Sequence, residues 1–125
     1  SGHFYFRDNW YADSGLIGAV IGLYVAGLTG KKLSELRTQY TRFAAIPETN
    51  FEVADKDKAI SEIASIFTDG EQNTLDGLTV SYEDSWFNVR PSNTESLLRL
   101  NAEARTKERL NELVEKLTAL IKGIS

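Results

Sequence analysis

The sequence predicts an α+β protein in which a β-α-β-β-β-α domain follows a helical segment. Two observations support this fold class. Between residues 75 and 102, apolar residues recur in three short runs separated by turn residues, which is typical of strands joined in hairpin sequence. The last segment of the chain instead repeats its apolar residues at helical spacing. Hairpin strands with helices packed on one face form an α+β sandwich.

Residues 1–45 are predicted to form an extended, aromatic-rich start followed by two helices. Asp13 and Ser14 are candidate N-caps of the first helix, whose apolar run is Leu16–Leu28. A bilayer-spanning helix needs roughly 20 apolar residues, so we expect a buried helix and no membrane segment. A second helix is expected over residues 35–43.

Residues 46–125 are predicted to form the second domain, because Ile46 precedes a proline and is pushed towards extended geometry. A strand at residues 51–53 leads to a helix capped by Asp55, and Thr106 is expected to cap the final helix. The apolar residues that define the three strands between these helices are Leu75, Leu78, Val80 and Tyr82; Trp86, Phe87 and Val89; and Leu97, Leu98, Leu100 and Ala102.

The composition is that of an ordinary globular protein, and it disfavours some partners and excludes some kinds of metal site. Of the 125 residues, 42% are hydrophobic and 26% charged, and the net charge is -4. This acidic balance disfavours nucleic acid as a partner, because nucleic-acid binding needs a basic face. The chain has no cysteine and one histidine, which leaves no thiolate or two-histidine metal site. We expect no metal site and a cytoplasmic location.

The segment 90–96, RPSNTES, lies between two predicted strands and has the composition of an anion-binding turn. Arg90 offers a planar fork of donors that matches two phosphate oxygens. Ser92, Asn93 and Thr94 are small and polar, and a turn built from them can point several backbone N–H groups into one hollow. The same residues are common in hairpin turns without any ligand. Composition alone favours that plainer interpretation.

The segment RPSNTESLLRLNAEA resembles the pattern RPSNTEP-LLR-EA of the α-D-phosphohexomutases, which include phosphomannomutase, phosphoglucomutase and phosphoglucosamine mutase. In this family the loop belongs to the fourth, C-terminal domain and holds the non-transferred phosphate of a hexose phosphate. The resemblance therefore implies that Arg90, Ser92, Asn93 and Thr94 contact that phosphate. Ser96 replaces a proline of the family pattern. The implied fold is TBP-like, a likeness of shape that implies no DNA binding.

The start of the chain, SGH followed by DSG, resembles the end of the family's sugar-recognition loop and the helix after it. The resemblance implies that residues 1–45 are the C-terminal tail of the third, α/β domain and that 46–125 are the fourth domain. Ser1 would bind sugar hydroxyls. His3 would lie near the transferred phosphate and assist proton transfer in the intact enzyme.

The resemblance also implies what the parent enzyme does and what this chain lacks. The parent would interconvert hexose 1-phosphate and hexose 6-phosphate through a hexose 1,6-bisphosphate, which serves as intermediate and activator. The reacting serine and the Mg²⁺ site would lie in missing N-terminal domains, so the chain alone is expected to be inactive. Its exposed apolar residues would favour self-association. The alternative is a stand-alone anion-binding or protein-interaction module.

Overall fold

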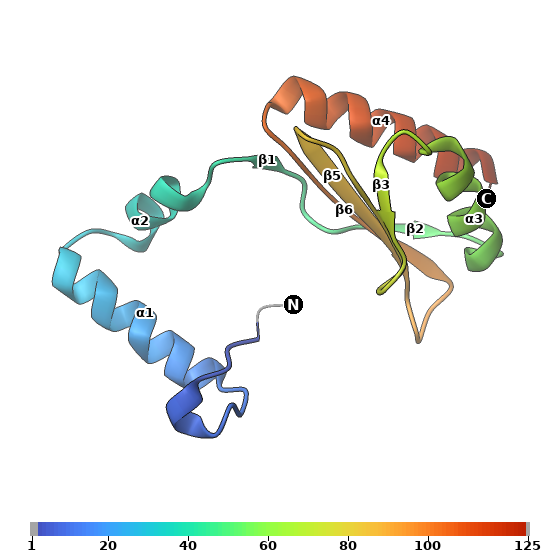
Figure 1. Cartoon of the computed structure of the whole chain (residues 1–125). Coiled ribbons are helices and arrows are strands. Elements are labelled where there is room, and N and C mark those ends of the chain that lie inside the picture. The colour runs from blue at the N-terminus through green and yellow to red at the C-terminus, as the bar shows by residue number, and fades with distance from the viewer. Residues whose placement is uncertain (1–2, 125) are drawn as a thin grey trace. The chain divides into compact units, whose positions relative to one another are not determined.

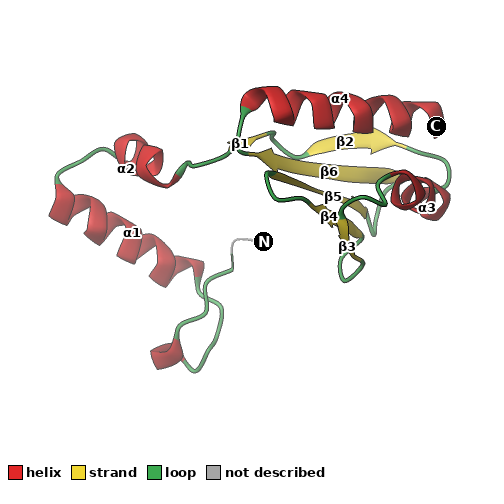
Figure 2. Cartoon of the chain, turned by 45° about the horizontal axis from the view of Figure 1, so that its top comes forward, coloured by secondary structure: helices red, strands yellow, loops and turns green. Residues whose placement is uncertain are grey.

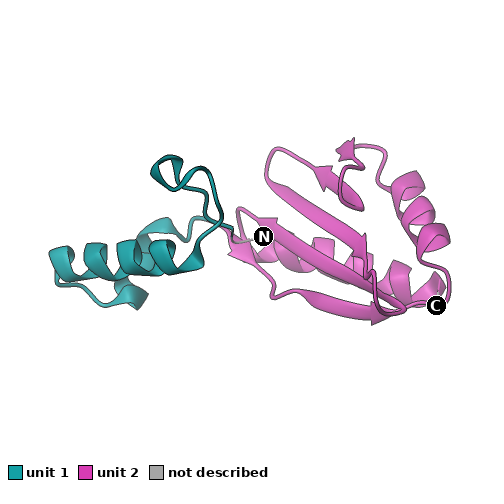
Figure 3. Cartoon of the chain, turned by 90° about the horizontal axis from the view of Figure 1, so that it is seen from below, with its two compact units in different colours: residues 1–42 teal, residues 43–125 magenta. Residues whose placement is uncertain are grey.

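A computed structural model describes residues 3–124 and divides the chain into two compact units, Ser1–Arg42 and Phe43–Ser125 (Figures 1 and 3). The division lies at Arg42 rather than at residue 45, because the residues just after it already pair with the sheet of the second unit. The assignment of the first unit to the tail of a third domain stays a prediction.

The first unit contains a short 3-10 helix, η1 (Arg7–Asn9), and two α-helices, α1 (Gly15–Thr29) and α2 (Leu33–Tyr40). Ser14 caps α1, since its Oγ accepts a hydrogen bond from the Ile17 N–H at 3.3 Å. The second helix begins and ends earlier than predicted. Among the described residues no single helix is long and apolar enough to cross a membrane, although α1 and α2 pass that test together as a pair bent by 99°.

The apolar residues of α1 are exposed rather than buried. Leu16, Leu23 and Leu28 each keep about two thirds or more of their surface, at 77%, 66% and 69%. The expectation of a buried helix is therefore wrong within the described residues, since α1 contains no buried residue. α1 therefore presents the exposed apolar residues that the sequence analysis expects to favour self-association.

The second unit is an antiparallel six-stranded sheet whose one face packs against two helices, so the predicted α+β class is confirmed (Figure 2). The strand order is β1-β6-β5-β4-β3, and β2 also pairs with β6. The elements are β1 (Ala44–Ala45), β2 (Thr49–Glu52), α3 (Lys56–Ile66), β3 (Glu71–Asn73), β4 (Leu78–Ser81), β5 (Ser85–Pro91), β6 (Leu97–Ala104) and α4 (Lys107–Ile124).

Two strands of this sheet were not predicted, and one predicted strand is too long. β1 has only two residues, and β3 consists of exposed polar residues, so neither carries an apolar pattern. The sequence predicts Leu75 within the strand that corresponds to β4, but Leu75 is 94% exposed and precedes β4. The chain turns between them at Gly77, whose φ of +69° is in the left-handed region that favours glycine.

Strict alternation in the central strands separates a buried face from an open one. Phe87 and Val89 of β5 are fully buried and lie opposite Ala102 and Leu100 of β6. Full burial of a side chain such as Phe87 contributes roughly 1.5–3 kcal/mol. The helices complete this core with Ala59 and Ile63 from α3 and with Leu110, Leu113, Leu117 and Ile121 from α4.

The predicted caps of the second-unit helices are confirmed. Asp55 accepts a hydrogen bond from the Lys58 N–H at 3.0 Å, and Thr106 Oγ1 accepts one from the Arg109 N–H at 3.2 Å. The caps satisfy backbone N–H groups in the first turns of α3 and α4. The opposite face of the central strands is half-buried and mostly polar.

We predict that Gly77→Ala destabilises the second unit by about 2 kcal/mol, because alanine at this φ is strained. The added Cβ would also lie 2.4 Å from the Val89 carbonyl oxygen. Urea unfolding followed by tryptophan fluorescence measures the change. The matched control is Gly123→Ala, whose Cβ meets open space within a helix; it is expected to add up to about 1 kcal/mol. Equal stability of the two variants would contradict the role of Gly77.

Candidate anion-binding site

The β5–β6 hairpin presents the predicted loop at one end of the sheet. The Ser92 N–H donates to the Leu97 carbonyl at 2.8 Å, which closes the loop. Ser92 is 4% exposed, and its Oγ has no hydrogen-bond partner among the described residues. Asn93 and Thr94 are exposed. Within residues 3–124 their backbone N–H groups donate no hydrogen bond either, so the loop holds unused donors.

Arg90 lies on β5 just before the loop, and its guanidinium is held by carboxylates. Its Nη2 donates to Glu48 Oε2 at 3.0 Å, and its Nη1 lies 3.9 Å from Asp76 Oδ2. The side chain is 37% exposed, so solvent and small anions reach it. The structure therefore brings Arg90 to the end of the loop, but its bonds in the described chain go to acidic residues and none to Ser92, Asn93 or Thr94.

Glu48 is the acceptor at the centre of this charged group. The hydrogen bond from Arg90, with a second from Asn101 Nδ2 at 3.4 Å, holds the pKa of the Glu48 carboxyl below its usual range. Arg99 adds its charge, with Nη1 at 3.7 Å from Glu48 Oε1. Glu48 is therefore an anion at neutral pH. The sequence analysis did not single it out, and only its charge, complementary to that of Arg90, could have suggested it.

Lys56 ties the first turn of α3 to the loop. Its Nζ donates to the Ser92 carbonyl at 2.8 Å and to the Glu95 carbonyl at 3.1 Å. These two bonds engage carbonyl oxygens that would otherwise repel an anion at the loop. Sequence reasoning missed this role, because the contact joins residues 36 positions apart.

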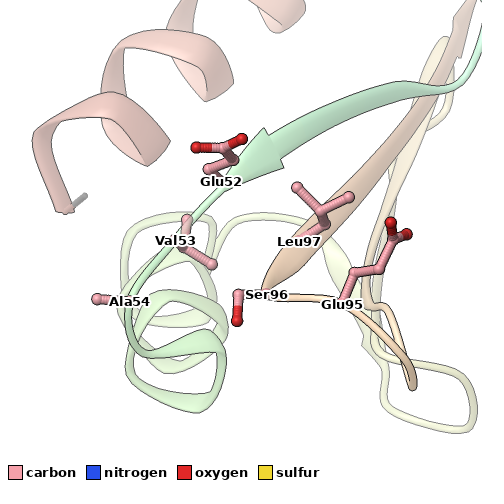
Figure 4. A pocket seen from close by; sticks show the side chains of 6 residues that line it. All are labelled: Glu52, Val53, Ala54, Glu95, Ser96 and Leu97. Atoms are coloured by element: carbon pink, nitrogen blue, oxygen red, sulfur yellow. The ribbon is translucent and has the colours of Figure 1, made fainter.

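A hollow of about 490 Å³ lies beside the loop, between the end of β2 and the start of β6 (Figure 4). Its lining residues are Glu52, Val53, Ala54, Glu95, Ser96 and Leu97. The side chains of Glu52 and Glu95 lie on opposite sides of it. Two carboxylates disfavour an anion there, and neither Arg90 nor Ser92 lines the hollow. The donors that are available to an anion are therefore those of the loop and the open sheet face.

The predicted residues at the start of the chain lie in the first unit. His3 Nδ1 is 2.5 Å from Asp13 Oδ2, and the Phe4 N–H donates to Asp13 Oδ1 at 3.0 Å. The hydrogen bond with His3 lowers the pKa of the Asp13 carboxyl from its ordinary value. Asp13 therefore holds His3 rather than capping α1. Ser1 lies outside the described residues.

Among residues 3–124 there is no group of three or more histidine, cysteine, aspartate or glutamate side chains that could hold a metal ion. The location of the Mg²⁺ that the resemblance implies for the parent enzyme stays a prediction.

The second unit is similar in sequence to a known domain family, and the matched region includes the loop. A family model described as the C-terminal domain of phosphoglucomutase/phosphomannomutase matches residues 48–120, which include the whole loop. The chain belongs to the phosphoglucomutase/phosphomannomutase family. The resemblance found in the loop sequence is thereby confirmed.

Relatives within the phosphoglucomutase/phosphomannomutase family match almost the whole chain. It is 38% identical to a phosphomannomutase of Methanocaldococcus jannaschii over 97% of its length, and 35% identical to a phosphoglucosamine mutase of Pediococcus pentosaceus over 98%. A crystal structure of a phosphoglucomutase/phosphomannomutase family protein from Burkholderia thailandensis covers 98% of the chain with a TM-score of 0.73 and 28% identity. The chain spans 27%, 26% and 27% of these three proteins, about a quarter of their length.

We predict that Lys56→Met loosens the loop. Loss of both hydrogen bonds from Nζ should speed amide hydrogen exchange at residues 92–96 and reduce the free energy of unfolding by about 1–2 kcal/mol. The matched control is Lys58→Met, which removes the same charge two positions along but breaks only an exposed ion pair with Glu62. That variant should change stability by less than about 0.5 kcal/mol. Equal amide exchange rates at residues 92–96 in Lys56→Met and Lys58→Met would show that the hydrogen bonds from Lys56 do not order the loop.

Proposed function

We propose that this chain supplies the substrate-phosphate-binding domain of a phosphohexomutase, an enzyme that interconverts hexose 1-phosphate and hexose 6-phosphate. The observation that carries the proposal is the loop that follows Arg90. It lies within the matched family domain, and it combines an accessible guanidinium with a buried, unbonded Ser92 hydroxyl and unused backbone donors. Such a set of donors suits the oxygens of a phosphate monoester.

Each residue of the loop would have a distinct part in binding. Arg90 would bind two phosphate oxygens through its planar fork. Ser92 Oγ and the backbone N–H groups of Asn93 and Thr94 would donate to the oxygens that Arg90 leaves free. Lys56 would act indirectly, by keeping the loop carbonyls engaged.

The reaction itself would need the other domains of the parent protein. Relatives are named phosphomannomutase, phosphohexose mutase and phosphoglucosamine mutase, and each is about four times as long as this chain. The reacting serine and Mg²⁺ would belong to those additional domains, and His3 would assist proton transfer beside them. We assign no covalent step to the described residues, and the chain by itself would bind hexose phosphate without turning it over.

The exposed apolar face of α1 fits the same proposal. A cluster of leucines this exposed on one helix is unusual in a protein that acts alone. The remaining domains of the parent enzyme would cover it, and the isolated chain would cover it by self-association.

We therefore expect the isolated chain to associate as its concentration rises from micromolar to millimolar, because association buries α1. Sedimentation equilibrium measures this. Leu23→Glu should weaken association, since Leu23 lies on α1 and is 66% exposed. Leu75→Glu is the matched control, because Leu75 is 94% exposed but lies in a loop of the second unit. A wild-type chain that stays monomeric throughout this range would refute self-association.

Arg90→Ala is the direct test of phosphate binding. We expect saturable NMR shifts at the amides of residues 92–96 when the wild-type chain is titrated with a hexose 6-phosphate. The variant should bind roughly tenfold more weakly, because it loses a charge-assisted, bidentate pair of hydrogen bonds. Arg105→Ala, an exposed arginine beyond the end of β6, controls for the change in net charge. Equal affinity of wild type and Arg90→Ala would overturn the proposed function.

A further inference from the structure

The open face of the sheet carries two arginines directly opposite each other. Arg90 of β5 pairs in register with Arg99 of β6. Both alternate with buried neighbours, Val89 on one strand and Leu98 and Leu100 on the other, so both project from the same open face. Like charges at directly opposite positions of an antiparallel pair are destabilising, because their Cβ atoms are only about 4.5–5.5 Å apart.

Glu48 already occupies the position of an anion between these two guanidiniums. Its Oε2 accepts from Arg90 Nη2 at 3.0 Å, and its Oε1 lies 3.7 Å from Arg99 Nη1. Asn101 Nδ2 supports the same carboxylate at 3.4 Å. Arg99 Nε is buried and has no hydrogen-bond partner among residues 3–124, so the protein does not satisfy every donor of this second guanidinium.

We propose that Glu48 is a resident counterion with which the substrate phosphate competes for Arg90 and Arg99. This inference rests on the proposed function of the loop. Arg99 becomes a second binding residue for the phosphate, and Glu48 becomes the residue that sets its affinity. A phosphate monoester carries up to two negative charges and three acceptor oxygens, against one charge and two oxygens for a carboxylate, so it is the stronger partner for a pair of guanidiniums.

The charges of the site give the direction of each effect. Arg90 and Arg99 bring two positive charges, which Glu48 and the more distant Asp76 offset. A phosphate entering this group is attracted by the guanidiniums and repelled by Glu48. Glu48→Gln keeps an oxygen that accepts from Arg90 but removes the repulsion. The substitution should therefore tighten binding, whereas loss of Arg99 should weaken it.

The test is a titration of the full 125-residue chain with inorganic phosphate and, separately, with a hexose 6-phosphate, followed at the amides of residues 92–96. Glu48→Gln should bind both about three- to tenfold more tightly than wild type, with a smaller gain at high salt. Arg99→Gln should bind more weakly, and Arg99→Lys should recover part of the loss. Glu103→Gln is the matched control, because Glu103 lies on the same face of β6 but bonds Trp86 instead of an arginine.

The Glu48 side chain of the wild-type chain reports the competition directly, so this test needs no substitution. The side-chain carboxyl carbon resonance of Glu48 should move with the same midpoint as the loop amides when phosphate is added, and should not move with chloride at equal ionic strength. A Glu48 resonance unaffected by saturating phosphate would overturn the competition.

The outcomes separate this inference from the proposed function. Saturable loop shifts with equal or weaker binding by Glu48→Gln would overturn the role of Glu48 and leave the phosphate site standing. Saturable shifts in Glu48→Gln but none in wild type would support both the phosphate site and the competing role of Glu48. The absence of saturable shifts in wild type and Glu48→Gln alike would overturn both, because the anion site itself would then not exist in this chain.

Discussion

The register of the β5–β6 hairpin is the constraint on which the rest of the second unit depends. By placing Phe87 opposite Ala102 and Val89 opposite Leu100, it assembles the buried face against which α3 and α4 pack. A slip of one residue would turn these side chains to the open face, so burial of the core enforces the pairing. The same register closes the loop between the strands and sets Arg90 opposite Arg99. The packing of the core and the geometry of the candidate anion site thus both follow from the register of this one strand pair.

The charged groups around the loop come from distant parts of the chain, and each contributes in its own way. Lys56, from the first turn of α3, fixes the loop through its carbonyl oxygens, and Glu48, from the connection before β2, neutralises the arginines of the open face. The site therefore forms only when β2, α3 and the hairpin are packed together. Because the capped helices and the buried face of the sheet supply that packing, stability of the fold and order of the loop are linked.

Local sequence was sufficient wherever burial or capping acts locally. The alternating apolar residues of β5 and β6, the helical spacing from Leu110 to Ile121 and the capping side chain of Asp55 all predicted elements that the structure contains. The exposed β3 and the two-residue β1 could not be predicted, because only pairing with a neighbouring strand makes them strands. The motif was sufficient to predict the loop. The roles of Lys56 and Glu48 could not be predicted, because Lys56 bonds Ser92 across 36 positions and Glu48 bonds Arg90 across 42, and no local pattern encodes such contacts.

The proposed function requires that the hairpin loop of this chain holds the phosphate of a hexose phosphate. A crystal structure of the chain grown with a saturating hexose 6-phosphate tests it most directly. We expect phosphate density within hydrogen-bond distance of the Arg90 guanidinium and the Ser92 hydroxyl, with the backbone N–H groups of Asn93 and Thr94 directed at the phosphate oxygens. A phosphate bound elsewhere, with Arg90 still paired to Glu48 and the loop empty, would contradict it.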